Sequence, residues 1–376
     1  MTLRRLVLVG AGHAHLHLVR EADRLRAAGL AVTLIAPPRF HYSGLASGVL
    51  SGALPIGAAE INVAALAAEF GVRHRPESVS GIDRTGRVLT PADGAPEPFD
   101  LLSLNIGSVA NDPHALAAHA GVWPVKPLAN LFALRTRLEG EISRGGPAPG
   151  MVVAGGGQSA LEIAASLCGL FETAGRRPDV TVVSPTFGGG LPAAARDRLL
   201  ASLRARGVAF QTGAVVGREA GACRLADGAT LPCDHLVLAT GLIAPPLIAG
   251  LGLPVDGDGR LRVTATLQSV GEATLFATGD CAVIADSRRP AAGVFGVRAA
   301  PVLLDNLVAL GCGQTLRSYR PQRRWLSIMD LGDGSGLAHR GRFWWMGRLS
   351  LRLKRYLDLG FVRRMRAPPQ TTGERP

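Results

Sequence analysis

Two segments of the chain share one pattern, an apolar run, a glycine turn and an amphipathic stretch, and this repeat limits the fold more than any other feature. The first segment is 5-RLVLVGAGHAH-15, which leads through a helical stretch to a second apolar strand, 31-AVTLIA-36. The second is 150-GMVVAGGGQSALEIAASL-167, followed by the strand 180-VTVVS-184. A buried strand, a glycine turn and a helix form the first half of a βαβ unit. The sequence therefore predicts an α/β protein with two Rossmann-like, doubly wound dinucleotide-binding domains.

The second glycine turn matches the dinucleotide-binding fingerprint. Gly155, Gly157 and Ala160 satisfy the pattern GxGxxA between a strand and a helix, as the fingerprint requires. Glu162 is expected on the first turn of that helix, either as a favourable charge near the helix N-terminus or as a residue close to a cofactor. This turn is the better of the two candidates for a nucleotide site.

The first turn, 10-GAGHAH-15, departs from the fingerprint. Gly10 permits the tight turn, and Gly12, after Ala11, lets backbone amides approach a pyrophosphate. The third position normally holds Gly or Ala for close helix packing, and here it holds His15. His13 and His17 could share a helix face at a metal, but no acid or cysteine nearby completes a ligand set, so we expect no metal site.

Both units lack the acid that usually follows the second strand and binds the adenosine ribose of NAD. The strands end instead in Ala36-Pro37-Pro38 and Ser184-Pro185. The absence of this acid weakens the prediction of NAD binding in the second unit, and it leaves NADPH, or no nicotinamide at all, as alternatives.

A third element, 277-ATGDCA-282, is an apolar strand that ends in Gly279-Asp280. Together with two dinucleotide turns and the strand end 238-LATG-241, it favours FAD, with the aspartate reaching the ribityl hydroxyls. The second unit is then inserted into the first. The expected domains are an FAD-binding domain (1–125 and 256–325), an NAD(P)-binding-like domain (126–255) and a C-terminal segment (326–376) for a membrane surface or a second subunit.

The net charge of +12 says little about partners, because only Lys126 and Lys354 among the 41 basic residues are lysines, an arginine bias typical of genome composition. We expect no nucleic-acid partner, since only the tail offers a basic patch with aromatics. Five scattered cysteines, with no CxxC pair and no secretory signal, indicate free thiols in the cytoplasm. The apolar run 236–255 contains prolines and glycines, which favour a buried strand and loop over a membrane helix.

The tail from 340 to 366 carries nine basic residues and one acid, Asp358. Wound as a helix, it gathers large apolar side chains on one arc and basic ones outside it, although Trp344 and Leu351 fall on the polar side. This pattern favours a helix lying on the inner face of the cytoplasmic membrane, and a docked dimer helix is the alternative. The apolar arc comprises Trp345, Met346, Leu349, Leu353, Tyr356 and Leu357.

The combined motifs resemble a known family. They include 42-YSGLASGVLSG-52, 101-LLSLNIGS-108, 125-VKP-127, 266-TLQS-269, 278-TGDCA-282, 290-PAAGVFGVRAAPVLLDNL-307 and the tail from 325 to 358. From about residue 5 to 366 the chain is similar to the FAD/NAD(P)-dependent, pyridine nucleotide-disulfide oxidoreductase-like module that some bacteria fuse to selenophosphate synthetase. That module is itself similar to type II NADH:quinone oxidoreductases and sulfide:quinone oxidoreductases.

The resemblance implies roles for individual residues. It implies that Glu162 and Lys126 are catalytic residues near the cofactors, that the helix after 293-GVFGVR-298 covers the pyrimidine end of the flavin, and that Cys281 packs instead of reacting. The residues expected to bind cofactor are Gly10, Ala11, Gly12, His13, His15, Val79, Asn105, Ile106, Gly107, Gly155, Gly157, Gly279, Asp280, Val294 and Phe295.

The implied activity is an FAD-dependent oxidoreductase that takes hydride from NADH or NADPH and passes electrons to a quinone or a similar acceptor. Two alternatives stay open. One is a reductase of selenium or sulfur compounds, and the other is a flavin-bound binding module without turnover.

Overall fold

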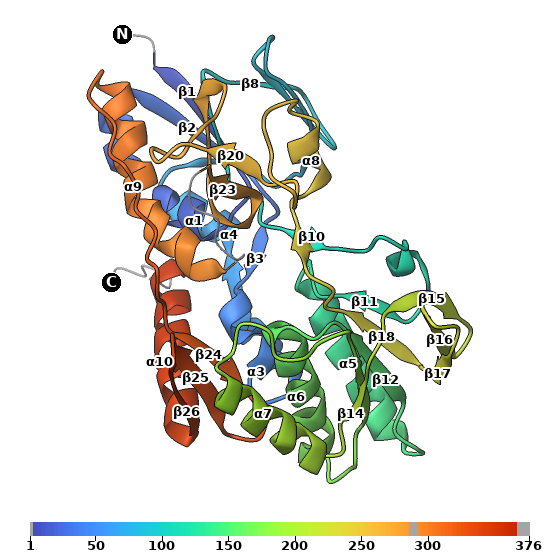
Figure 1. The fold of residues 1–376 in the computed structure, drawn as a ribbon. Coiled ribbons are helices and arrows are strands. Elements are labelled where there is room, and N and C mark those ends of the chain that lie inside the picture. The colour runs from blue at the N-terminus through green and yellow to red at the C-terminus, as the bar shows by residue number, and fades with distance from the viewer. Residues whose placement is uncertain (1–2, 286–291, 367–376) are drawn as a thin grey trace, which may run out of the picture.

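The computed structural model describes residues 3–285 and 292–366, and it is an α/β structure with two separate main sheets, in which most neighbouring strands are parallel (Figure 1). The larger sheet has the strand order β23-β20-β21-β22-β9-β1-β2-β5. Its strands are β1 (Arg4–Val9), β2 (Leu30–Ile35), β5 (Arg73–Arg75), β9 (Leu101–Leu104), β20 (Leu261–Val263), β21 (Gln268–Ser269), β22 (Glu272–Ala277) and β23 (Ala282–Ile284).

Alternation along β1 explains how this sheet is covered on both faces. Leu6 and Leu8 belong to the core beneath the helices, whereas Val7 and Val9 belong to a second core on the opposite face. The helical layer comprises α1 (His13–Arg20), α2 (Ala22–Ala27), α4 (Val63–Glu69) and α9 (Gly293–Gly311). The opposite layer comprises β6 (Val79–Asp83), β7 (Val88–Pro91), β8 (Glu97–Pro98) and α8 (Pro246–Ala249).

The smaller sheet is wholly parallel, in the order β11-β18-β12-β13-β14. Its strands are β11 (Val122–Pro124), β12 (Gly150–Ala154), β13 (Asp179–Val183), β14 (Ala209–Gln211) and β18 (His235–Leu238). Three helices, α5 (Ala129–Arg144), α6 (Gln158–Thr173) and α7 (Ala193–Ala205), accompany it. An antiparallel sheet of β15 (Val215–Glu219), β16 (Ala222–Leu225) and β17 (Thr230–Pro232) shares a core with its other face.

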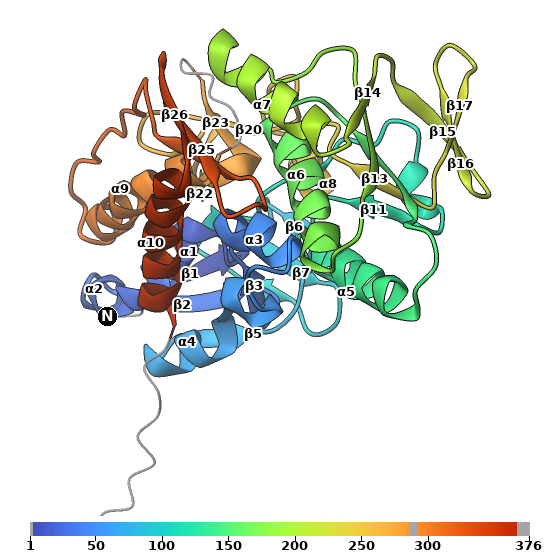
Figure 2. The same ribbon diagram turned by 90° about the horizontal axis from the view of Figure 1, so that it is seen from below.

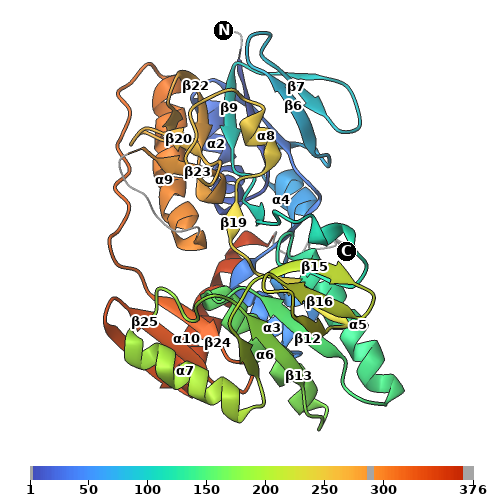
Figure 3. The same cartoon turned by 45° about the vertical axis from the view of Figure 1, so that its right-hand side comes forward.

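The chain leaves the first sheet after β9 and returns to it at β20, so the second unit is inserted into the first. The two connecting segments pair with each other as the antiparallel strands β10 (Val109–Ala110) and β19 (Leu242–Ile243), which lie between the two units (Figure 3). The apolar run 236–255 forms β18, β19 and α8, as the sequence predicted. Within the described residues one helix, α9, is long and apolar enough to cross a membrane by length and composition, and half of it is buried in this structure.

The C-terminal segment folds as an antiparallel sheet followed by a helix. Its elements are β24 (Ser327–Asp330), β25 (Gly336–Arg340), β26 (Phe343–Gly347) and α10 (Arg348–Met365) (Figure 2). The predicted helix through Trp345 and Met346 was therefore wrong, because both residues pair with β25, opposite Ala338 and Leu337.

The rest of the predicted tail helix is present as α10, and it has two apolar faces. Leu351, Phe361, Val362 and Met365 are buried against the protein, which explains why Leu351 did not fit the predicted apolar arc. Leu349, Leu353, Tyr356 and Leu357 lie on the opposite face and are exposed to between 36% and 72%.

Candidate functional site

The first glycine turn is held together by one side chain, Asn105 at the end of β9. Its Oδ1 accepts hydrogen bonds from the backbone N–H groups of Ala14 (3.0 Å) and His15 (3.3 Å), and its Nδ2 donates to the carbonyl of Thr278 (2.7 Å). Gly12 packs so tightly against Asn105 that a Cβ there would overlap the amide group, and Gly10 has a φ of +85°. Asn105 thereby ties the start of α1 to the ends of β9 and β22.

His15 occupies the position where the fingerprint has Gly or Ala, and it is fully buried. Its Nδ1 lies 2.7 Å from the carbonyl oxygen of Gly10 and its Nε2 lies 2.8 Å from Oγ of Ser103. A carbonyl only accepts, so Nδ1 carries the proton and Nε2 accepts from the serine hydroxyl. Burial lowers the pKa of His15 to about 4, against the opposing effect of the Gly10 hydrogen bond. Because both ring nitrogens form hydrogen bonds, the buried side chain of His15 stabilises the turn.

His13 is the first residue of α1 and lies where three parts of the chain meet. Its ring centroid is 5.5 Å from that of Phe40, 5.4 Å from that of Tyr42 and 5.4 Å from that of Phe361. A Cβ at Gly293, the first residue of α9, would lie 3.2 Å from the His13 ring. The N-termini of α1 and α9 therefore meet at His13, and the positive ends of the two helix dipoles favour an anionic group there. Burial lowers the pKa of His13 to about 4.

Asp280 follows β22 at the same edge of the sheet. Ser108 donates a hydrogen bond to its Oδ2 at 3.1 Å, and Gly279 before it has a φ of +78°. Gly107 also has a positive φ, of +72°, so the loop after Asn105 turns sharply beside this carboxylate. The combination offers helix amides to a phosphate and a carboxylate to hydroxyl groups, which is the set of donors and acceptors that FAD requires.

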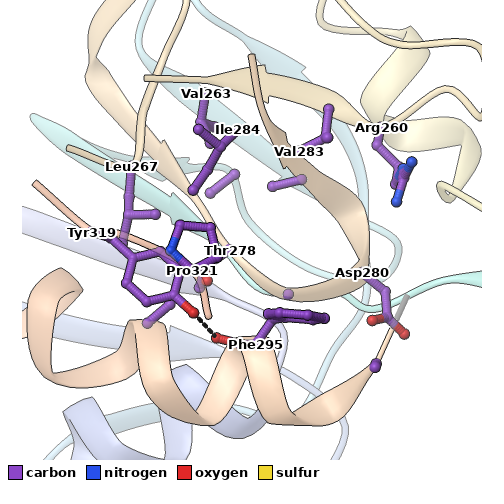
Figure 4. A pocket seen from close by; sticks show the side chains of 15 residues that line it. Arg260, Val263, Leu267, Thr278, Asp280, Val283, Ile284, Phe295, Tyr319 and Pro321 are labelled. Atoms are coloured by element: carbon purple, nitrogen blue, oxygen red, sulfur yellow. Dashed lines mark hydrogen bonds between the residues drawn. The ribbon is translucent and has the colours of Figure 1, made fainter. Parts of the chain in front are cut away.

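The first turn of α9 borders a small pocket of about 60 Å³ (Figure 4). Val294 and Phe295 lie in this turn, and the hydroxyl of Tyr319 donates to the carbonyl of Phe295 at 3.3 Å. The Phe295 ring meets the Trp325 ring edge to face, with centroids 5.2 Å apart. Asp280 lies at one end of this pocket and also lines the central cavity described below.

In the second glycine turn, two glycines have no space for a side chain and one has space for it. A Cβ at Gly155 would overlap the carbonyl of Ala239, and one at Gly156 would overlap that of Thr186. A Cβ at Gly157 would meet no described atom within 4 Å apart from its chain neighbours. Because Gly157 also lines the cavity and precedes α6, its open side is where an anion could approach the helix amides.

The second glycine turn, Asp280, the start of α9 and the C-terminal segment line a cavity of about 830 Å³. Both predicted catalytic residues lie in its wall. Lys126 is partly buried, and this burial lowers its pKa, while the charge of Asp280 opposes that effect. The cavity lining includes Gly155, Gly156, Gly157, Lys126, Glu162, Asp280, Trp325 and Lys354.

Glu162 lies in the second turn of α6, since the helix begins at Gln158, so its predicted place in the first turn was wrong. Its Oε1 accepts a hydrogen bond from the backbone N–H of Asp330 at 2.8 Å. Burial raises the pKa of Glu162, while Lys354, the Asp330 N–H and the Ser47 hydroxyl oppose the rise. The carboxyl group therefore joins α6 to the C-terminal sheet.

Sequence reasoning missed a cluster that the C-terminal helix brings to this cavity. Lys354 Nζ lies 3.2 Å from Oδ2 of Asp358, and the Tyr42 hydroxyl donates to Oδ1 of the same carboxylate at 2.9 Å. Tyr42 belongs to the first unit and Asp358 to the tail, so their contact spans more than 300 residues of sequence. The rarity of lysine in this chain was the only signal in the sequence that pointed to Lys354.

Four further predicted positions lie away from the cavity lining. Val79 begins β6 and packs with Ile106 at the margin of the second core, and Ala11 is buried in the first. Cys281 is buried and directs Sγ to the carbonyl of Thr278 at 3.4 Å, and burial raises its pKa to about 12, which fits packing. Cys223 and Cys233 are free thiols buried in one core, the one that the antiparallel sheet β15-β16-β17 shares with the smaller parallel sheet.

Comparison with known proteins agrees with this geometry. The family model of the pyridine nucleotide-disulphide oxidoreductases matches residues 4–300. A probable ferredoxin reductase, CtmF, from Castellaniella defragrans is 26% identical over 294 residues, covering 73% of this chain and 67% of that protein. Demethylphylloquinone reductase NdbB from Synechocystis is 27% identical, covering 57% of this chain and 55% of that protein.

Among solved structures, NDH2 from Plasmodium falciparum in complex with NADH superposes with a TM-score of 0.80 at 12% identity, covering 96% of this chain and 97% of that one. This likeness concerns the fold, which is that of flavoproteins with two dinucleotide-binding domains. Since the family model spans most of the chain, and both glycine turns stand where the fold requires them, the chain belongs to the pyridine nucleotide-disulphide oxidoreductase family.

Proposed function

We propose that this protein transfers electrons from NADH or NADPH, through FAD, to a quinone or a quinone-like acceptor. The observation that carries the proposal is the central cavity, which the second glycine turn lines together with Asp280, Lys126 and Glu162, and whose lining residue Gly293 lies beside His13 of the first turn. Reductases of demethylphylloquinone and probable ferredoxin reductases are among its relatives.

The first unit has the residues to hold FAD. The positive end of the α1 dipole would bind the pyrophosphate, and Asp280 would accept hydrogen bonds from ribityl hydroxyls. Asn105, Gly10 and Gly12 fix the turn, and the start of α9 at Val294 and Phe295 lies beside Asp280. When bound, the flavin supplies the chemistry of hydride acceptance and electron transfer, and the protein supplies position and charge.

The second unit would hold the nicotinamide donor. The open side of Gly157 leaves room for the donor's pyrophosphate at the start of α6. Ser184, at the end of β13, presents no carboxylate to the adenosine ribose, so the usual basis for preferring NADH over NADPH is missing. We therefore expect NADPH to serve at least as well as NADH.

Lys126 and Glu162 are suited to handling protons in this cavity. Burial lowers the pKa of Lys126 and raises that of Glu162, so each group is shifted towards exchanging a proton with a bound ligand. Reduction of a quinone consumes one proton from solvent beyond the hydride, and buried groups of this kind can deliver it.

The exposed face of α10 favours a membrane surface. Its exposed apolar residues are Leu349, Leu353, Tyr356 and Leu357, and it also carries exposed Arg348 and Arg352. Phe343 and Trp345 on the preceding strand β26 are exposed as well. An apolar face flanked by arginines is what a helix at an anionic lipid surface requires. We propose a cytoplasmic protein attached to the inner face of the cytoplasmic membrane, and a second subunit on the same face is the alternative.

The test is stopped-flow spectroscopy of the purified protein loaded with FAD. We expect a yellow protein whose flavin is bleached by NADPH or NADH and restored by a soluble quinone. Restoration by selenium or sulfur compounds, and not by quinones, would favour the alternative reductase. A flavin that neither donor bleaches would refute the enzyme and leave a flavin-bound binding module.

A further inference from the structure

Two of the five cysteines lie together in the second unit. Cys223 lies on β16 and Cys233 directly follows β17, which is the next strand of the same antiparallel sheet. Both are exposed by at most 1% and belong to the same core. Cys168 and Cys281 are buried in the two other cores, and Cys312 is exposed. The hairpin therefore creates a thiol pair that the spacing in the sequence does not show.

The strand register brings the two thiols to the same face of the hairpin. Cys223 lies opposite Leu231, and the backbone N–H of Cys233 donates to the carbonyl of Gly221 at 2.8 Å. Because side chains alternate along a strand, Cys223 and Cys233 are diagonal neighbours on the buried face, while Arg224 is exposed on the other. The position opposite Cys233 is a glycine, so no side chain there fills the space beside the Cys233 thiol.

A guanidinium group lies beside this pair. Arg218 on β15 lies directly opposite Cys223. Its Nη1 donates to the carbonyl oxygens of Ala222 at 3.2 Å and Cys233 at 2.5 Å, and its Nη2 donates to that of Asp234 at 3.0 Å. Its Nε is buried and has no hydrogen-bond partner among the residues that the structure describes. A fixed positive charge with one unused donor is therefore held next to the two thiols.

These surroundings make Cys223 the more acidic thiol of the two. A hydrogen bond from the Cys233 thiol lowers the pKa of Cys223, burial opposes this effect, and the charge of Arg218 adds to it. The same hydrogen bond, together with burial, raises the pKa of Cys233. By contrast, burial raises the pKa of Cys168 to about 11 and that of Cys281 to about 12. Because the thiolate is the reactive form, Cys223 is suited to attack an oxidant, with a second thiol beside it.

The pair lies between the outside of the protein and the wall of the central cavity. The sheet of β15, β16 and β17 forms the periphery of the second unit (Figures 1 and 3). Local opening of a peripheral sheet admits a molecule as small as hydrogen peroxide. On the inner side, members of the same core also line the cavity, namely Leu116, Ala154, Val183, Val215 and Leu238. A bond between the two sulfurs would thus form directly behind the wall that adjoins the second glycine turn.

We infer that Cys223 and Cys233 are a redox-sensitive pair, which hydrogen peroxide oxidises to a reversible disulfide. The Cys223 thiolate attacks one peroxide oxygen, the O–O bond breaks, and the leaving hydroxide takes up a proton to give water. Cys233 then loses its proton, its sulfur attacks the sulfur of the Cys223 sulfenic acid, the S–O bond breaks, and a second water leaves. The two thiols together lose two electrons and two protons, which reduce one peroxide to two waters. Arg218 is a positioning residue.

Reversible formation fits a reducing compartment, where disulfides are transient and sense oxidants. Neither a nucleotide nor a quinone takes part in this step, so the inference stands or fails separately from the proposed electron transfer.

The experiment maps the thiols of the FAD-loaded protein before and after treatment with hydrogen peroxide. Cys312→Ser removes the exposed thiol, and the remaining thiols are alkylated after denaturation. Trypsin cleaves after Arg224, so the two cysteines fall in the separate peptides 219–224 and 225–260. We expect peroxide to remove two alkylated thiols and to cross-link these two peptides, and we expect dithiothreitol to restore both thiols. Because the core of this protein is unaltered, the result does not depend on the folding of a core variant.

Further variants separate the roles of the residues. Cys233→Ser should accumulate a sulfenic acid at Cys223 that dimedone traps, whereas Cys223→Ser should leave Cys233 unoxidised. Arg218→Met should slow disulfide formation roughly tenfold at neutral pH but no more than about twofold at about pH 10, where Cys223 ionises without a nearby cation. Arg218→Lys keeps the charge and should keep the wild-type pH profile. The matched control is Cys168→Ser, at a buried cysteine of another core, and it should form the disulfide as wild type does.

Two results would overturn the inference. One is full alkylation of Cys223 and Cys233 after a peroxide treatment that oxidises Cys312 in the wild-type protein. The other is a cross-link from Cys223 to any cysteine other than Cys233.

Discussion

Replacement of His15 by alanine tests how the unusual first turn is stabilised. The imidazole makes two buried hydrogen bonds, to Gly10 and Ser103, and lies in the core between α1 and the sheet. Each such bond contributes about 1 kcal/mol, and loss of the ring leaves a cavity and an unpaired hydroxyl. We expect His15→Ala to lower the free energy of unfolding at neutral pH by about 3 kcal/mol.

The same residue makes stability depend on pH in a defined direction. Burial lowers the pKa of His15 from 6.5 to about 4, so on acidification the unfolded chain takes up a proton that the folded protein refuses. Stability is therefore lost as the pH falls from about 6.5 to about 4 and is unaffected above that window. At about pH 5 the pH lies about 1.5 units below the pKa of the unfolded histidine. Protonation of this one residue therefore lowers the free energy of unfolding by about 2 kcal/mol.

Urea denaturation at about pH 7.5 and about pH 5, at constant FAD, gives both quantities. His15→Ala should be the less stable protein at neutral pH, yet its loss of stability between the two pH values should be smaller than that of wild type by about 2 kcal/mol. His13 contributes a similar loss in both proteins. His119→Ala, which removes an exposed histidine, is the matched control and should leave the difference unchanged. An unaltered pH dependence in His15→Ala would refute the argument that His15 is held neutral in the fold.

Two further predictions concern the nucleotide site and the tail. The added methyl of Gly157→Ala meets open space, so the protein should fold and bind flavin normally. Flavin reduction by NADPH should slow at least tenfold, which corresponds to roughly 1.4 kcal/mol or more in activation free energy. An unchanged rate in stopped flow would place the donor elsewhere. The double variant Leu349→Glu and Leu357→Glu should abolish sedimentation with anionic liposomes. The control Val255→Glu, at an exposed apolar residue of the first unit, should sediment as wild type does. Unaltered sedimentation of the double variant would favour a subunit interface on the exposed face of α10.

The fold could be predicted because its main signals are local. An apolar strand, a glycine turn and a helix each depend on neighbouring residues, and the second copy 150–167 forms β12, the turn and α6 as predicted. The insertion also followed from sequence, since the strand at 274–277 returns to the sheet of β1 and pairs with β9. Gly155 and Gly157 needed no partner to be recognised, because their conformational role is intrinsic to the turn.

The parts that could not be predicted depend on contacts distant in sequence. His15 was recognised as a departure, but its partner Ser103 lies 88 residues away. Trp345 was assigned to a helix because helical periodicity fitted its neighbours, whereas pairing with Ala338 placed it in a strand. Leu351 conflicted with a single apolar arc because α10 has a second apolar face buried against the protein.

The two faces of α10 connect the proposed surface of attachment with the central cavity. Leu349, Leu353 and Tyr356 point to solvent on one side, while Lys354 lines the cavity on the other side and pairs there with Asp358. An α-helix with its side chains is about 10 Å across, so a lipid surface against the outer face would lie only one helix from the cavity wall. A quinone dissolved in lipid then has a short path to the cavity, whereas a water-soluble quinone gains nothing from attachment. The charged double substitution at Leu349 and Leu357 should thus impair reduction of long-chain quinones in vesicles and spare that of short-chain quinones in solution.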